Sequence, residues 1–252
     1  MDNKRLIKLA SWAGKIILES GGETYRVEET ITRILIAYGL KDAESFVTPT
    51  GIMVSLTEEN GNVISLIQRV KKSNVDLEKV SLINSLSRQV AIKHLSLDEL
   101  NQKLQVIDER KPYSLGFQLF MAALSGFSFT LLFGGNFADA SAAWLIGIGV
   151  RIMQHYTREI NLNGIFINIL GGGFVAMSSL FLTEILPFEM HINTIIIGSI
   201  MLLVPGIAFT NAIRDTLMGD YLSGVSRGME AFLIAVGIAI GAGMILGIAG
   251  NF

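Results

Sequence analysis

Two apolar stretches without charged residues limit most strongly which folds this chain can adopt. Residues 192–213 and 231–252 contain no Asp, Glu, Lys, Arg or His, and as a helix each is long enough to cross about 30 Å of hydrocarbon. Pro205-Gly206 interrupts the first stretch, and a short polar connection that carries Arg214 and Arg227 separates it from the second. The sequence therefore predicts an integral membrane protein that is mainly α-helical.

Charged residues divide the chain into two parts. Residues 1–113 hold 16 of the 20 Lys and Arg and 15 of the 22 Asp and Glu. We expect a water-soluble α+β domain at 1–113 and a transmembrane domain at 114–252. Neither part has the concentrated basic face of a nucleic-acid-binding protein. The sequence contains no Cys, which excludes disulfides and thiolate sites, and we expect no cofactor and no metal.

Local signals predict the elements of the N-terminal part. Apolar residues at helical spacing predict helices over 4–19 and over 23–38, separated by Gly21-Gly22. Apolar residues then alternate from Val47 to Leu56, and a second β-branched run follows an Asn-Gly pair, which is the pattern of a β-hairpin.

Two further helices are predicted after the hairpin. Asp76 can cap a helix that ends near His94, and Ser96 with Glu99 forms the sequence pattern of a capping box for a helix that ends near Glu109. His94 has no partner at metal-ligand spacing, so we interpret it as structural.

Hydropathy predicts a bundle of five membrane-spanning helices in the C-terminal part. The expected spans lie near 115–134, 139–155, 164–186, 192–213 and 231–250. Lys and Arg are absent from the connections after the first and third spans. They flank the other connections, as Arg110, Lys111, Arg151, Arg158, Arg214 and Arg227. By the positive-inside rule the N-terminal domain is cytoplasmic and the C-terminus lies outside.

The interrupted stretch is the first candidate for a substrate site. Pro205 and Gly206 weaken the helix there, and broken helices are a common feature of secondary transporter sites. Asn211, Arg214 and Asp215 follow at spacings that place them on one helix face. The arginine could hold a carboxylate and Asp215 could take up a proton. The alternative is a solvated cytoplasmic turn in which Arg214 only sets topology.

Other polar and small residues in this part are weaker candidates. Asp139 and Glu184, near span ends, are candidates for proton or cation coupling. The alternative is that they have no such role, because a carboxylate at the membrane interface costs little free energy. Glycines are expected to allow close helix packing at Gly171, Gly172, Gly173, Gly237 and Gly241. In the N-terminal part, the cluster of Glu19, Glu23, Arg26 and Glu28 reads as capping and ion pairs more readily than as a catalytic carboxylate pair.

The run PGIAFTNAIRDTLMGDYLSGVSRGMEAFLIAVGIAIGAG resembles the threonine/serine exporter family, as do SGGETYRVEETITRILIAYGL and VTPTGIMVSL. The resemblance covers essentially the whole chain. It implies an exporter of small carboxylate solutes, either hydroxy amino acids or a dicarboxylate such as succinate, in the bacterial inner membrane. It also implies the larger subunit of the family's two-chain layout, with a second small all-membrane subunit and membrane lipid as partners.

Three hypotheses remain open from the sequence. The first is a secondary exporter subunit that is not an enzyme; the chain has no GxxxxGK[ST] phosphate loop. The second is a regulatory or enzymatic domain tethered to the membrane, whose hydrolytic activity the sequence does not exclude. The third is a scaffold subunit with the transport pathway in its partner.

Overall fold

The computed structural model describes residues 2–58, 60–71, 74–93, 95–159 and 164–250, without the side chains of residues 158 and 159. His94 lies outside the described residues. The chain forms two compact units, and the helix α10 contributes to both. The first unit combines residues 1–111 with Ile207–Met229, and the second combines Pro112–Gly206 with Glu230 onward.

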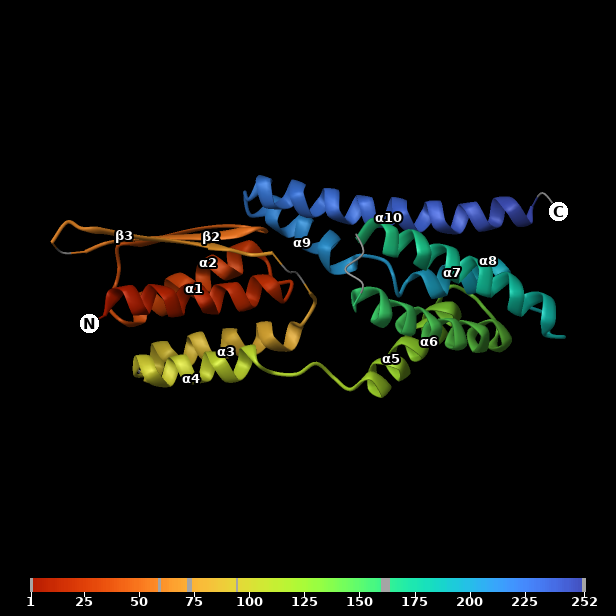
Figure 1. Ribbon diagram of the computed structural model, residues 1–252, viewed down its shortest axis with the longest axis horizontal. Coiled ribbons are helices and arrows are strands. Elements are labelled where there is room, and N and C mark those ends of the chain that lie inside the picture. Colours follow the sequence, from red (N-terminus) through yellow and green to blue (C-terminus); the bar gives the residue numbers. More distant parts are fainter. Residues whose placement is uncertain (1, 59, 72–73, 94, 160–163, 251–252) are drawn as a thin grey trace. The chain divides into compact units, whose positions relative to one another are not determined.

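The first unit begins with two helices, α1 (Asn3–Glu19) and α2 (Thr24–Ala37), which lie between a sheet and a second helix pair (Figure 1). The helix pair is α3 (Leu77–Lys93) and α4 (Leu97–Asp108). One apolar core joins these layers. It includes Leu6, Ile17, Ile31, Ile83 and Leu100, each of which has an exposed fraction of 0%. The predicted capping box is present, because Ser96 Oγ accepts from Glu99 N while the Glu99 carboxylate accepts from Ser96 N.

The sheet has three antiparallel strands in the order β1-β2-β3, namely β1 (Ala43–Thr48), β2 (Gly51–Thr57) and β3 (Val63–Arg69). The predicted β2–β3 hairpin is confirmed. A tight turn at Pro49-Thr50 divides the alternating stretch from Val47 to Leu56 into two strands and pairs Thr48 with Gly51. That turn changes the parity of the buried positions, which are Val47 on β1 but Ile52 and Val54 on β2.

Two more helices complete the first unit: α9 (Gly206–Leu217) and the first turns of α10 (Tyr221–Ala249). The expected polar connection between the last two spans is therefore mostly helical, and α10 begins ten residues before the predicted start at 231. Arg227 lies on this helix and is 7% exposed, since its charge is satisfied within the unit and the helix need not end there.

The second unit contains α5 (Leu115–Leu132), α6 (Phe137–Glu159), α7 (Gly164–Ile185), α8 (Ile192–Ile200) and the remainder of α10. Within the described residues, α5, α7 and α10 are long and apolar enough to cross a membrane. Helix α6 has the length but carries charged residues, including Asp139 and Arg151. The helix interruption predicted at Pro205-Gly206 is present, because residues 201–205 separate α8 from α9.

Glycines bring α7 and α10 close together in the second unit. A Cβ atom on Gly172 would lie 2.2 Å from the Ile238 carbonyl oxygen, and one on Gly241 would lie 1.9 Å from the Ile169 carbonyl oxygen. The Cβ positions of Gly171, Gly173 and Gly237 also meet neighbouring atoms, at 3.0, 3.4 and 3.2 Å. At Gly172 and Gly241 a larger side chain would force the two helix backbones apart.

Candidate functional site

The turn between α1 and α2 is shaped by two glycines. Gly21 has φ of +82°, a left-handed conformation that favours glycine. A Cβ atom on Gly22 would lie 2.3 Å from Ile17 Cγ2. The connection from β3 also binds this turn, since Asn74 N donates to the Glu19 carbonyl and Asp76 N to the Ser20 carbonyl. Both glycines are buried, so their carbonyl groups need partners from elsewhere in the chain.

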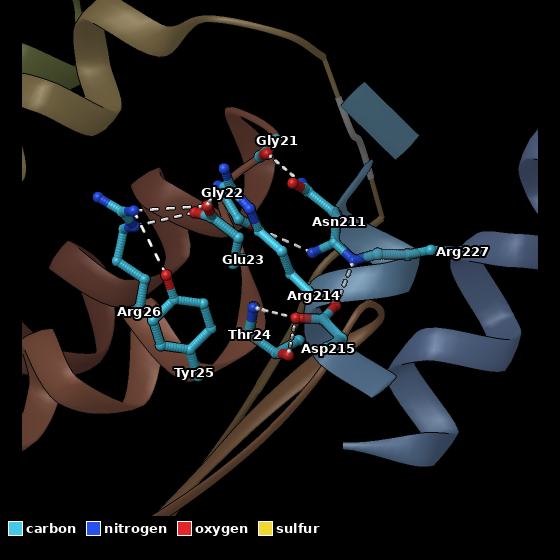
Figure 2. A network of polar contacts seen from close by, with 10 residues as sticks. All are labelled: Gly21, Gly22, Glu23, Thr24, Tyr25, Arg26, Asn211, Arg214, Asp215 and Arg227. Carbon is cyan, nitrogen blue, oxygen red and sulfur yellow. Dashed lines mark hydrogen bonds and ion pairs between the residues drawn. The ribbon is translucent and has the colours of Figure 1, made fainter. Parts of the chain in front are cut away.

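Side chains from α9 and α10 supply these partners (Figure 2). Asn211 Nδ2 donates to the Gly21 carbonyl over 2.9 Å, and an Arg227 guanidinium NH2 donates to the Gly22 carbonyl over 2.7 Å. The two helices can converge there because a Cβ atom on Gly224 would lie 2.1 Å from Thr216 Oγ1 and 3.0 Å from the Ala212 carbonyl oxygen. A turn thus binds two helices that lie about 190 residues later in the sequence.

Asp215 is the most enclosed charge of this site, with an exposed fraction of 0%. Its Oδ1 accepts from the Thr24 hydroxyl over 2.8 Å and from Thr24 N over 3.3 Å. Its Oδ2 lies 3.1 Å from Arg227 Nε, an ion pair whose orientation does not make a hydrogen bond. Neither Oδ2 nor Nε has a hydrogen-bond partner among the described residues. The carboxylate therefore has an ion-pair partner, but only one of its two oxygens accepts hydrogen bonds.

A second ion pair lies beside it on the same turn. Glu23 Oε1 is 2.5 Å from an Arg214 guanidinium nitrogen, and Glu23 Oε2 is 2.9 Å from Arg26 Nε. The Glu23 side chain is 7% exposed, whereas that of Arg214 is 52% exposed. Arg214 therefore reaches from the surface to a buried carboxylate.

Electrostatics distinguish these two carboxylates. Burial raises the pKa of Glu23, but its own backbone N–H and the two arginines outweigh burial, so the pKa lies below its ordinary value. For Asp215 burial prevails over Thr24 and Arg227, with a contribution from Asp220, and the pKa is raised. Burial also raises the pKa of Glu28, which accepts from Val47 N over 2.9 Å.

The structure places the residues of the predicted substrate site as follows. Asn211, Arg214 and Asp215 share one face of α9, and that face meets the Gly21–Thr24 turn. Pro205 and Gly206 stand at the interruption before α9, where a Cβ atom on Gly206 would meet nothing within 4 Å.

Sequence reasoning missed the partners of that face, namely Gly21, Gly22, Thr24 and Arg227. The one available signal was the Gly-Gly pair itself, since two buried glycine carbonyls after a helix require donors.

The coupling candidates of the second unit have different surroundings. Asp139 is 0% exposed and accepts from Asn136 N over 2.9 Å, from His191 N over 2.7 Å and from His191 Nδ1 over 3.0 Å. Asn136 Oδ1 accepts in return from Asp139 N. Glu184 is exposed on α7. No local pattern predicts that His191 pairs with Asp139, since 52 residues separate them.

The acidic cluster around the first turn forms ion pairs and a strand contact. Lys15 pairs with Glu19 at 3.7 Å, Arg26 with Glu23, and Glu28 binds the backbone of β1. Among the described residues, no group of three or more His, Asp or Glu is arranged to hold a metal ion.

Comparison with known proteins identifies the family. The threonine/serine exporter model, ThrE, matches residues 8–249. The chain belongs to the threonine/serine exporter family. No solved structure matches it.

Relatives within the threonine/serine exporter family carry two kinds of name. A Mycobacterium tuberculosis protein named "Probable threonine/serine exporter" is 20% identical over 96% of this chain, which spans 46% of that protein. Proteins from Klebsiella aerogenes and Escherichia coli, each named "Probable succinate transporter subunit YjjP", are 24% and 23% identical over 95% and 98% of this chain. The chain spans 92% and 96% of those two, and less than half of the first.

Proposed function

We propose that the chain is a subunit of a secondary exporter that moves a small carboxylate solute out of a bacterial cell. The solute is threonine or serine, or a dicarboxylate such as succinate. Family membership, three helices of membrane length and the names of the relatives support this proposal. The chain then acts as a transporter and not as an enzyme.

The substrate class rests on one observation, the pairing of Arg214 with Glu23. A half-exposed guanidinium already holds a carboxylate there over 2.5 Å. Arginine binds carboxylates through paired N–H groups, so a carboxylate of the solute can replace Glu23 on Arg214. In this proposal Asn211 and Asp215 hold α9 in place beside Arg214, and the interruption at Pro205-Gly206 gives α9 its separate position in the chain.

The proposed membrane arrangement has five spans with the N-terminal domain in the cytoplasm. It adds α6 and the interrupted segment of residues 192–213 to the three described helices of membrane length. Arg110 and Lys111 before α5, and Arg214 and Arg227 after the interruption, favour this orientation.

A second, small all-membrane subunit completes the proposed exporter. The two relatives that this chain spans over 92% and 96% are named as transporter subunits. The N-terminal domain is proposed to be part of the exporter, because residues 21–24 and 211–227 bury their polar groups against each other. A separately functioning tethered domain would not need those contacts.

The test is counterflow of labelled succinate, threonine and serine in proteoliposomes that hold this chain with and without the second subunit. Arg214→Ala should abolish counterflow, whereas the matched variant Glu23→Gln, which breaks the same ion pair, should retain it and lower the KM. Equal loss in both folded variants would show that the pair is only structural. Normal counterflow in Arg214→Ala would contradict the proposal that Arg214 binds the solute.

A further inference from the structure

Thr24 presents one hydroxyl group to two carboxylates. Its Oγ1 lies 2.8 Å from Asp215 Oδ1 and 3.1 Å from Asp220 Oδ2, both at hydrogen-bond distance. A threonine hydroxyl carries a single proton but can also accept. If both aspartates are ionised, one of the two short contacts therefore has no proton of its own. One additional proton would complete both.

The second indication is the unsatisfied oxygen of Asp215. Asp215 Oδ2 is buried and has no hydrogen-bond partner in the described part of the chain, and the same holds for Arg227 Nε, which lies 3.1 Å away and is also buried. A buried carboxylate oxygen without a hydrogen-bond donor makes the charged form of the group costly. A second negative charge close to Asp215 is therefore energetically unfavourable.

The charges that face Asp215 come from three elements. Arg227 on α10 is its ion-pair partner, Asp220 follows α9, and Glu28 lies on α2 near enough to interact with both aspartates. The other arginine of the site, Arg214 on α9, is paired with Glu23. Asp215 thus pairs with one buried cation while two further carboxylates lie near it, and burial raises the pKa of both Asp215 and Glu28.

We propose that Asp215, Thr24 and Asp220 form a binding site for one proton. The two carboxyl groups share one bound proton: the protonated aspartate donates to Thr24 Oγ1, and Thr24 donates its own proton to the other aspartate. No bond other than these O–H bonds changes, and Asp215 Oδ2 stays beside Arg227 Nε. This proposal deepens the proposed exporter function and rests on it in one respect: the proton is its coupling ion.

A proton fits this site better than a metal cation. Arg227 Nε lies 3.1 Å from Asp215 Oδ2 and would repel a cation placed against that carboxylate. A proton avoids that repulsion because it is held within the hydrogen-bond chain that joins the two aspartates through Thr24.

The binding test is infrared spectroscopy of the purified full chain, with no solute present, while pH is varied. The wild-type protein should show a protonated carboxyl band at neutral pH. Asp215→Asn and Asp220→Asn each remove one of the two like charges, so the band should disappear at neutral pH and its midpoint should fall by about one pH unit or more. Thr24→Ser keeps the hydroxyl and should keep the band, as should Asp42→Asn at an exposed control position.

Three results would overturn the proton site. They are the absence of the band in the wild-type protein, its persistence in both Asp215→Asn and Asp220→Asn, and a shift of its midpoint when Na⁺ replaces K⁺. Asp220 is only partly buried, so its variant keeps the test decisive if Asp215→Asn does not fold.

Flux measurements separate this proposal from the exporter proposal. Solute counterflow that is absent while the band is intact would contradict the exporter and leave the proton site standing. Under an imposed pH gradient, Asp220→Asn should lose proton-driven solute accumulation, whereas the control Asp42→Asn should keep it. Wild-type accumulation in Asp220→Asn would show that the proton is not the coupling ion.

Discussion

Asp215 and Asp139 are both completely buried, yet their surroundings differ. Asp139 accepts from two backbone N–H groups and an imidazole nitrogen, and both of its oxygens are used. Asp215 has a single residue, Thr24, as its donor, and one of its oxygens has no hydrogen bond within the described part of the chain. A carboxylate whose two oxygens both accept hydrogen bonds stabilises a fixed structure, whereas a carboxylate with an oxygen that accepts none can change its protonation state. We therefore interpret Asp139 as structural and Asp215 as part of the titrating site.

The largest effect is expected when the single cation of the Asp215 site is removed. Arg227→Met would leave buried carboxylates without their partner and should lower the free energy of unfolding by about 3–5 kcal/mol. Denaturant unfolding of the purified protein in detergent micelles measures this. The double variant Arg227→Met/Asp215→Asn should recover much of the loss. A double variant as unstable as the single one would show that the ion pair is not the cause.

Removing the Asp139 carboxylate should cost less. Asp139→Ala leaves the N–H groups of Asn136 and His191 without an acceptor, and we expect a loss of about 1–3 kcal/mol. Proton-driven accumulation per folded protein should remain. If Asp139→Ala instead folded normally and lost only the pH-gradient response, the roles assigned to the two aspartates would be reversed.

The pH dependence of stability should separate the two residues. The pKa of Asp215 is raised in the folded protein, so its contribution to stability decreases as pH rises from the ordinary value of 3.8 through the folded pKa. In Asp215→Asn this decrease is absent, so the difference in free energy of unfolding between the wild-type protein and the variant should become smaller as pH rises. The change should be about 1.4 kcal/mol for each tenfold difference in the proton affinity of Asp215 between the folded and unfolded states. Urea unfolding midpoints over a pH series measure it; a constant gap would contradict a raised pKa.

The smallest effect is expected at His191, whose side chain is 59% exposed. His191→Gln removes one of the three donors to Asp139 and leaves both backbone donors, so we expect a loss of about 1 kcal/mol. Unfolding measured beside Asp139→Ala gives the comparison. Equal losses in the two variants would mean that the imidazole, and not the backbone, satisfies Asp139.

Local features of the fold could be predicted from the sequence. The capping box of Ser96 and Glu99, two residues three positions apart, determines where α4 begins, and the Asn-Gly pair determines the β2–β3 hairpin. The spacing of Asn211, Arg214 and Asp215 correctly implied one shared helix face. These signals act over a few residues, so the sequence pattern contains them completely.

The partners of that face could not be predicted, because they are non-local. Thr24 and Asp215 are 191 residues apart, and no short pattern connects them. The extension of α10 back to Tyr221 could not be predicted for the same reason. A charged residue such as Arg227 normally marks the end of an apolar span, but here the buried carbonyl of Gly22 and the Asp215 carboxylate satisfy it.

The sequence separation of this contact also bears on how the protein is made. Gly21 leaves the ribosome 190 residues before Asn211, which at ordinary rates of synthesis is a delay of roughly 10 to 40 s. During that interval the apolar core of α1 to α4 can form, while the two glycine carbonyls have only water as a partner. The polar cluster can therefore close only after α5 to α8 have been translated, and a truncated or arrested chain would display its first turn uncovered.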